Sequence, residues 1–283
     1  MEVLRALGAL AEDAGEERRR VADALGLGPL DAAEFTDLFS FALYPYASVY
    51  LGAEGMLGGE ARDRIAGFWR ALGATPPDEP DHLTTMLALY ASLAEAAAAE
   101  SVPGRKAALE HARAAFFWEH LASWLPVYLA KARRVARGAY AVWARMLSDA
   151  LESEAARLPA PASLPLHLRA VPPFEERDGN GDEEVIPLLL APARAGFVLV
   201  RRDLRGIADA LGVGLRQGER RYALGALLAC DRPRVLGRLA GLALEAAACH
   251  AALAPAWGET MRFWECRAAA TAKALRALEA ASI

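Results

Sequence analysis

The chain has 283 residues, of which 54% are hydrophobic, and a formal net charge of -4 at pH 7. This length is enough for one large domain or two modest domains, each with its own buried core. The three cysteines lie in the last fifth of the chain without a repeated spacing, which argues against a disulfide framework and against a zinc site.

The N-terminal segment lacks the pattern of a secretory signal. Residues 1–14 have no basic start followed by a continuous apolar stretch, and no window reaches about 20 uncharged apolar residues. We therefore expect a cytoplasmic protein without a membrane span. Alanine supplies much of the hydrophobic content and is the best intrinsic helix former, so the composition favours helices over a sheet.

Charge is unevenly distributed along the chain. Residues 1–184 hold 18 basic and 28 acidic side chains, a net charge of about -10, whereas residues 185–283 hold 14 and 8, a net charge of about +6. An acidic first part suits a cationic partner, and a mildly basic second part suits an acidic partner.

Helical periodicity dominates the chain from its start. Short helices are predicted near residues 2–12, 16–26, 31–41 and 60–73. The clearest helix follows them, because apolar residues recur at positions i, i+3, i+4 and i+7 until Pro103-Gly104 closes the segment. Its predicted buried stripe consists of Leu83, Met86, Leu87, Tyr90, Leu93 and Ala97.

Two further apolar stripes complete the first part of the chain. One extends from Leu109 to Tyr128 and contains Pro126, which lacks a backbone N–H and should kink or split the helix. The other extends from Val135 to Leu151. Three stacked stripes predict an all-α helical bundle over residues 1–158.

The helical pattern stops between residues 159 and 184, where five prolines precede an acidic run. We predict a Pro-rich and acidic linker here. The apolar runs at 186–190 and 197–200 are too short and too close to prolines to predict a sheet. Residues 185–283 are expected to form an additional helical C-terminal region, with helices at about 202–212, 218–229, 233–253 and 259–280.

A proline-stiffened acidic turn precedes the clearest helix. Asp81 is expected to cap the first N–H groups of that helix, a contribution of about 1 kcal/mol, and its charge complements the helix dipole. Glu79 and His82 also form one Glu-x-x-His pair, the ligand pair that each of two helices contributes to a di-iron site. Because only one copy is present, we expect no metal site here. No cofactor is assigned to the chain, and the binding of a nucleotide or a pterin stays open.

The segment Glu79-Pro80-Asp81-His82-Leu83, followed about forty residues later by Phe117, His120-Leu121 and Trp124-Leu125-Pro126, resembles the TorD/DmsD/NarJ family. The resemblance covers roughly residues 35–158. It implies a cytoplasmic, all-helical and non-catalytic chaperone with a TorD-like bundle. Members of this family bind the twin-arginine signal peptide and the folding body of molybdopterin oxidoreductases until the cofactor is inserted. The implied partner is such a precursor.

The resemblance also implies which residues bind the partner. The segment from Glu79 to His82 corresponds to the hinge-loop motif of the family, and His120 and Trp124 match a second block. A twin-arginine signal carries two guanidinium groups and a weakly apolar stretch, so acidic side chains can form charge-assisted hydrogen bonds with it. For His120 and Trp124 the alternative is core packing. The expected partner-binding residues are Asp78, Glu79, Pro80, Asp81, His82, His120 and Trp124.

Two other motifs give weaker alternatives. Residues 178–182 resemble the start of a calcium loop, but Glu183 and Leu189 stand where glycine and glutamate are required. The segment from 204 to 228 resembles a helix-turn-helix inside the basic region 201–238, although Gly218 and Arg221 occupy inward positions of its second helix. A helical nucleic-acid-binding regulator is therefore the alternative function.

An enzyme is not expected, because the sequence contains no nucleophile motif, phosphate loop or Asp-rich diphosphate motif. A helical enzyme for a small molecule would need a bound cofactor. No function is assigned to residues 185–283 as a whole: completion of the bundle, contact with the mature client enzyme and self-association are three alternatives for this region.

Overall fold

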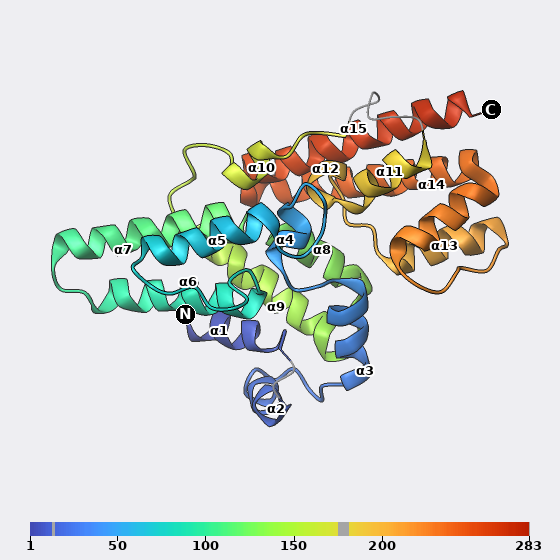
Figure 1. Ribbon diagram of the computed structural model, residues 1–283. Helices are drawn as coiled ribbons and strands as arrows, with labels where there is room; N and C mark the ends of the chain where they lie inside the picture. Colours follow the sequence, from blue (N-terminus) through green and yellow to red (C-terminus); the bar gives the residue numbers. More distant parts are fainter. Residues whose placement is uncertain (13–14, 175–180, 283) are drawn as a thin grey trace. The chain divides into compact units, whose positions relative to one another are not determined.

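The computed structural model describes residues 1–12, 15–174 and 181–282. Within these ranges every regular element is a helix, which confirms the predicted all-α class (Figure 1). The helices form two compact units. The first contains Met1–Ser48 and Leu57–His167, and the second contains Val49–Met56 and Leu168–Ile283.

The first unit starts with short helices and continues with long ones. The short helices are α1 (Glu2–Ala9), α2 (Gly15–Ala24), α3 (Ala32–Phe35), the π-helix η1 (Thr36–Ala42), α4 (Ala47–Leu51) and α5 (Gly59–Ala71). The elements that follow are α6 (Leu83–Ala99), α7 (Pro103–Phe116), the π-helix η2 (Phe117–Leu121), α8 (Leu125–Val135) and α9 (Gly138–Ala155). Helix α4 begins in this unit and ends in the second.

Helix α6 is the centre of the first unit. It packs against α7, to which a short loop joins it, and against α1, while α9 packs against α1 and α8 (Figure 1). All six residues of the predicted α6 stripe are buried, so this prediction is confirmed. Because apolar burial contributes roughly 25 cal/mol per Å², this stripe is a main source of stability for the unit.

The predicted break at Pro126 is a complete split. Helix α7 passes into the π-helix η2, which ends at Leu121, and α8 begins again at Leu125. Pro126 lies in the first turn of α8, where a helix does not use the missing N–H. Trp124 occupies the break, fully buried, and its indole N–H donates to His120 O (3.0 Å).

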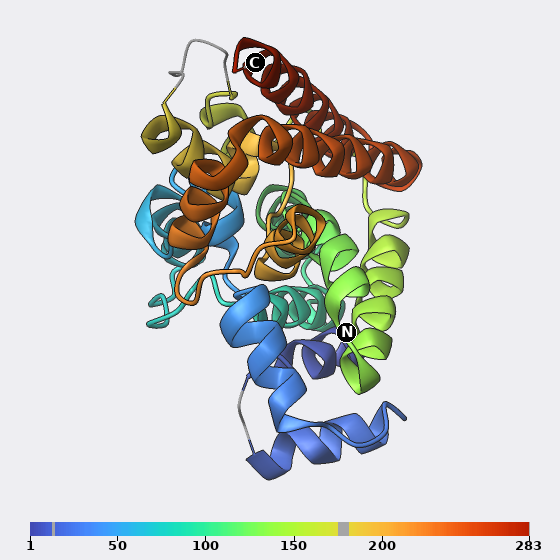
Figure 2. The same cartoon turned by 90° about the vertical axis from the view of Figure 1, so that its right-hand side faces the viewer.

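The second unit is built on a hairpin of two long helices, α14 and α15, which lie side by side in orange and red (Figure 2). Its elements are α10 (Leu166–Ala170), which starts at the end of the first unit, α11 (Asp182–Leu190), α12 (Pro192–Ala195), α13 (Arg201–Leu211), α14 (Arg220–Trp257) and α15 (Glu259–Ala281). Side chains of α11, α13, α14 and α15 share one apolar core.

Helix α14 contains a break that agrees with the two helices predicted there. Asp231 has non-helical backbone angles (φ -154°, ψ 80°), and its carboxylate accepts from Arg234 N (3.1 Å) at the start of the second half. By length and composition α14 is the one helix among the described residues that is able to cross a membrane. The expected absence of a membrane span therefore stays a prediction.

The predicted linker over 159–184 also stays a prediction. Residues 175–180 lie outside the described part of the chain, and with them most of the rejected calcium-loop motif. On either side, α10 forms within the proline-rich stretch, and α11 begins at Asp182, inside the acidic run. The apolar run at 186–190 is thus helical and contains Pro187.

Candidate functional site

The turn before α6 is paired with the loop before α4. Ala47 N donates to Asp81 O (2.9 Å) and Leu83 N donates to Pro45 O (2.8 Å), so Tyr46 and His82 face each other in an antiparallel β-bridge. These bonds fix the motif from Glu79 to His82 on a rigid support, because both backbone segments are held by hydrogen bonds.

Asp81 does not cap the helix that follows it. Its side chain is 2% exposed, and its carboxylate accepts from Ser48 N (3.2 Å) in the first turn of α4. The N-cap of α6 is His82, whose Nδ1 accepts from Thr84 N (3.3 Å). The predicted capping of α6 by Asp81 is therefore wrong, because the β-bridge turns this carboxylate toward another helix.

His82 is buried between acidic and aromatic neighbours. Its ring meets the ring of Tyr46 edge-on, with centroids 4.8 Å apart, and its Nδ1 lies 3.9 Å from a carboxylate oxygen of Glu12. Burial lowers the pKa of His82, while the carboxylates of Glu12, Glu79 and Asp81 act in the opposite direction. An Nδ1 that accepts a hydrogen bond from Thr84 carries no proton, which agrees with the lowered pKa.

Three carboxylates around this support face the solvent: Glu12, Asp78 and Glu79. We call them the acidic set. Glu79 accepts from the Tyr46 hydroxyl (2.9 Å), and burial of Tyr46 together with this bond raises the pKa of Tyr46 to about 12. The backbone carbonyl of Asp78 accepts from Arg62 (3.0 Å), so the carboxylate of Asp78 is not used for that contact. The acidic set therefore offers negative charge at a fixed place.

Exposed aromatic side chains precede the β-bridge in the chain. Tyr44 lies two residues before Tyr46 and is 36% exposed, and Phe41 at the end of η1 is 62% exposed. Aromatic surface of this kind, close to a bridge that carries carboxylates, matches the mixed chemistry expected for a peptide with both cationic and apolar residues.

His120 and Trp124 lie in the core, away from solvent. His120 is 4% exposed, its Nδ1 is 2.9 Å from His167 Nε2, and its ring packs on Phe68 and Phe116. Burial lowers the pKa of His120 to about 3, so this imidazole is neutral near pH 7. The predicted contact of His120 and Trp124 with a partner stays a prediction. Their position in the core favours a role in supporting the break between α7 and α8.

Sequence reasoning did not single out Glu12, Tyr46 or Ser48. Glu12 approaches His82, which lies 70 positions later in the sequence. Tyr46 contacts Glu79, which lies 33 positions later. No spacing rule links residues at such separations. Tyr46 lies inside the region of family resemblance, and this is the one signal that pointed to its neighbourhood.

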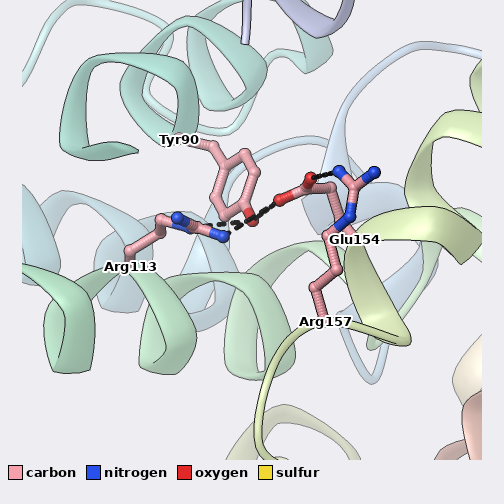
Figure 3. Close-up of polar contacts among 4 residues, drawn as sticks. All are labelled: Tyr90, Arg113, Glu154 and Arg157. Carbon is pink, nitrogen blue, oxygen red and sulfur yellow. Dashed lines mark hydrogen bonds and ion pairs between the residues drawn. The ribbon is translucent and has the colours of Figure 1, made fainter. Parts of the chain in front are cut away.

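A second polar cluster joins three helices of the first unit (Figure 3). Glu154 of α9 accepts from the Tyr90 hydroxyl (2.6 Å), from Arg113 (3.1 Å) and from Arg157 (3.0 Å). Arg113 also donates to the Tyr90 oxygen (3.1 Å), and the pKa of Tyr90 is raised, first by burial and then by Glu154. Both oxygens of Glu154 are occupied, which indicates a structural link rather than a catalytic carboxylate.

The basic region 201–238 uses several of its arginines internally. Arg201 donates to Arg216 O (2.7 Å), Arg220 donates to Leu199 O (2.7 Å) and Arg234 donates to Ala210 O (3.1 Å). These bonds hold the loop between α13 and α14 and the ends of the two helices. The arrangement favours a structural role for these guanidinium groups, and nucleic-acid binding stays an untested alternative.

The described residues contain no group of three or more His, Cys, Asp or Glu side chains placed to hold a metal ion. Glu79 and His82, the pair considered as metal ligands, are instead engaged with Tyr46 and Thr84. The side chains at this site thus provide charge and aromatic surface, and they are carried by a rigid backbone.

Comparison with protein families gives a match over the first part of the chain. The model of the family described as nitrate reductase delta subunit matches residues 3–130. The matched segment contains the acidic set, the β-bridge, η2 and the start of α8, and it ends before α9. Comparisons with curated proteins and with solved structures gave no match.

Proposed function

We propose that the chain, whose residues 3–130 match the family described as nitrate reductase delta subunit, is a redox-enzyme maturation chaperone that binds the twin-arginine signal peptide of a molybdopterin oxidoreductase precursor. In this proposal the chain acts in the cytoplasm, as a non-catalytic protein. It holds the apo-enzyme until the cofactor is inserted and then releases it for export.

One observation supports the proposal most strongly: the acidic set is exposed and lies around the Tyr46–His82 bridge, which holds the local backbone in place. Guanidinium groups form short, charge-assisted hydrogen bonds with carboxylates, often in pairs. The exposed aromatic residues Phe41 and Tyr44 supply apolar surface for the stretch that follows the two arginines. Recognition of a basic segment followed by an apolar one needs both kinds of surface.

The buried members of the motif have a different role from the exposed ones. Pro80, Asp81 and His82 are buried and hold the turn in its conformation, whereas the side chains of Asp78 and Glu79 are exposed to solvent, where the arginines of a peptide can reach them. His120 and Trp124 support the break between α7 and α8. Substitution of the buried residues would change both folding and binding, so the exposed carboxylates give the cleaner test.

The test uses a synthetic peptide with a twin-arginine motif followed by a weakly apolar segment, and measures its affinity for the full chain. We expect the triple variant Glu12→Gln, Asp78→Asn, Glu79→Gln to bind at least tenfold more weakly, since each charge-assisted bond contributes about 1.5–3 kcal/mol. Asp149→Asn, an exposed carboxylate of α9, is the control and should bind like the original chain.

The same variants identify the client in cells. The original chain and Asp149→Asn should enrich a molybdopterin oxidoreductase with a twin-arginine leader from the native host, and the triple variant should not. Melting temperatures of all variants are compared to confirm folding. Equal peptide affinity in the triple variant would refute the proposed site, and recovery of no such enzyme by the original chain would refute the proposed partner.

A further inference from the structure

Two consecutive apolar side chains are exposed in the loop before α5. Met56 is 63% exposed and Leu57 is 59% exposed, although both residue types are most often buried in proteins. We call them the apolar pair. Single exposed apolar residues are ordinary on protein surfaces, so the surroundings of this pair in the first unit decide what it can do.

Leu57 is tied to the motif turn through the residue that follows it. Gly58 N donates to Ser48 Oγ (3.1 Å), and Ser48 N in turn donates to the carboxylate of Asp81 (3.2 Å). Two hydrogen bonds therefore lead from the backbone next to Leu57 to the buried carboxylate of the motif.

Helix α5 makes a second link to the same turn. Arg62, five residues after Leu57, donates to Asp78 O (3.0 Å), and this turn carries the exposed carboxylates of Asp78 and Glu79. Because both links end on residues 78–81, the segment that starts at Leu57 is held beside the motif turn. The apolar pair is thus continuous with the acidic set.

The apolar pair and the acidic set complement each other chemically. An extended peptide advances roughly 3.3–3.6 Å per residue, so the first few residues after the two arginines reach a surface that lies two hydrogen bonds away from Asp81. Leucine offers apolar area to these residues. Methionine is unbranched and polarisable, and it adapts to apolar partners of different shape.

We propose that Met56 and Leu57 bind the apolar stretch that follows the two arginines and select signal peptides by the hydrophobicity of this stretch. The proposal rests on the proposed signal-peptide function and adds to it a source of specificity. The acidic set recognises the arginines, whereas the apolar pair discriminates among peptides that all carry them. Affinity should rise with the apolar area of the stretch, because the hydrophobic effect scales with the area removed from water.

The experiment measures the affinity of the full chain for two synthetic peptides with the same two arginines. In one peptide the following stretch contains leucines, and in the other serine replaces every leucine. We expect the original chain to bind the leucine peptide about tenfold or more tightly than the serine peptide. This ratio of affinities is the readout for the apolar pair.

The double variant Met56→Gln, Leu57→Gln should lower the ratio about fivefold or more, because it removes apolar area that only the leucine peptide uses. Its affinity for the serine peptide should stay unchanged, which also shows that the variant is folded. Leu244→Gln is the matched control: this leucine of α14 is 51% exposed, and its loss should leave the ratio as it is.

The outcomes separate this proposal from the proposed function. The triple variant Glu12→Gln, Asp78→Asn, Glu79→Gln should bind both peptides more weakly and keep the ratio. If the original chain binds the two peptides equally, or if the double variant keeps the ratio, the selection by Met56 and Leu57 is refuted while the proposed function stands. If the original chain binds neither peptide, both are refuted.

Discussion

The carboxylate of Glu154 is buried and accepts hydrogen bonds from three side chains. Glu154 is 4% exposed and receives hydrogen bonds from side chains of α6 and α7 and from Arg157, just after the end of its own helix. Loss of one partner in a buried ion pair costs about 3–5 kcal/mol, because the remaining charge stays desolvated. Residues of three helices therefore depend on a single side chain.

We predict that Glu154→Gln lowers the free energy of unfolding by about 3 kcal/mol, since Arg113 is left half-buried without its counter-ion. Chemical denaturation measures this loss. The control is Arg157→Gln, which removes the exposed partner, whose side chain is 70% exposed, and should cost less than about 1 kcal/mol. Equal losses in the two variants would show that the buried pair is not the stabilising contact.

Residues of the candidate site differ in how far the sequence can predict them. Asp78 and Glu79 are found by the motif in which they lie. Glu12 and Tyr46 are not, because tertiary contacts bring them to His82 and Glu79. The role of Asp81 is misjudged for the same reason: local sequence suggests a cap on the next helix, whereas a β-bridge directs the carboxylate to Ser48.

Among the elements, periodicity predicts the long helices well. The stripes of α6 and α9, the split before Pro126 and the break in α14 all follow from side-chain spacing and proline chemistry. Helix α11 is missed because its first turn is acidic and Pro187 interrupts its pattern. Acidic residues favour a helix N-terminus, and the run at 182–184 forms the first turn of α11.

The contact between α12 and α15 depends on one residue. We predict that Gly196→Ala destabilises the second unit by about 3 kcal/mol or more, because Cβ meets backbone atoms of α15 and the left-handed conformation disfavours a side chain. The matched control is Gly206→Ala in α13, where no atom lies within 4 Å of the new Cβ. That change should stabilise the chain by up to about 1 kcal/mol.

Thermal unfolding of the two glycine variants gives opposite signs if this account is correct. A Gly196→Ala protein that melts at the original temperature would mean that α12 can move away from α15 at little cost.

Across the whole molecule, buried histidines couple stability to pH. Burial lowers the pKa of His120 to about 3, of His250 to about 4, and of His167 well below its usual value. Near pH 7 these rings are neutral in both the folded and the unfolded chain. As the pH falls below about 6.5, the unfolded chain takes up protons that the folded chain cannot accept, so the free energy of unfolding decreases.

His250 gives a measurable share of this effect. It is 3% exposed, and its Nε2 lies 3.0 Å from Gly196 O. A histidine with a folded pKa of about 4 and an unfolded pKa of about 6.5 loses about 2 kcal/mol of stability between pH 7 and pH 5. We predict that His250→Gln reduces the stability difference between these two pH values by that amount, even if the variant is less stable at pH 7.

Denaturation curves at pH 7, 6 and 5 test this prediction, and His111→Gln provides the control because His111 is exposed on α7. Carboxylates paired in the folded chain lose stability mainly below about pH 5, so the window from 7 to 5 isolates the histidines. His111→Gln should keep the pH dependence of the original chain. If His250→Gln keeps it too, the buried imidazole is protonated in the folded state and the second unit can hold a charge at that position.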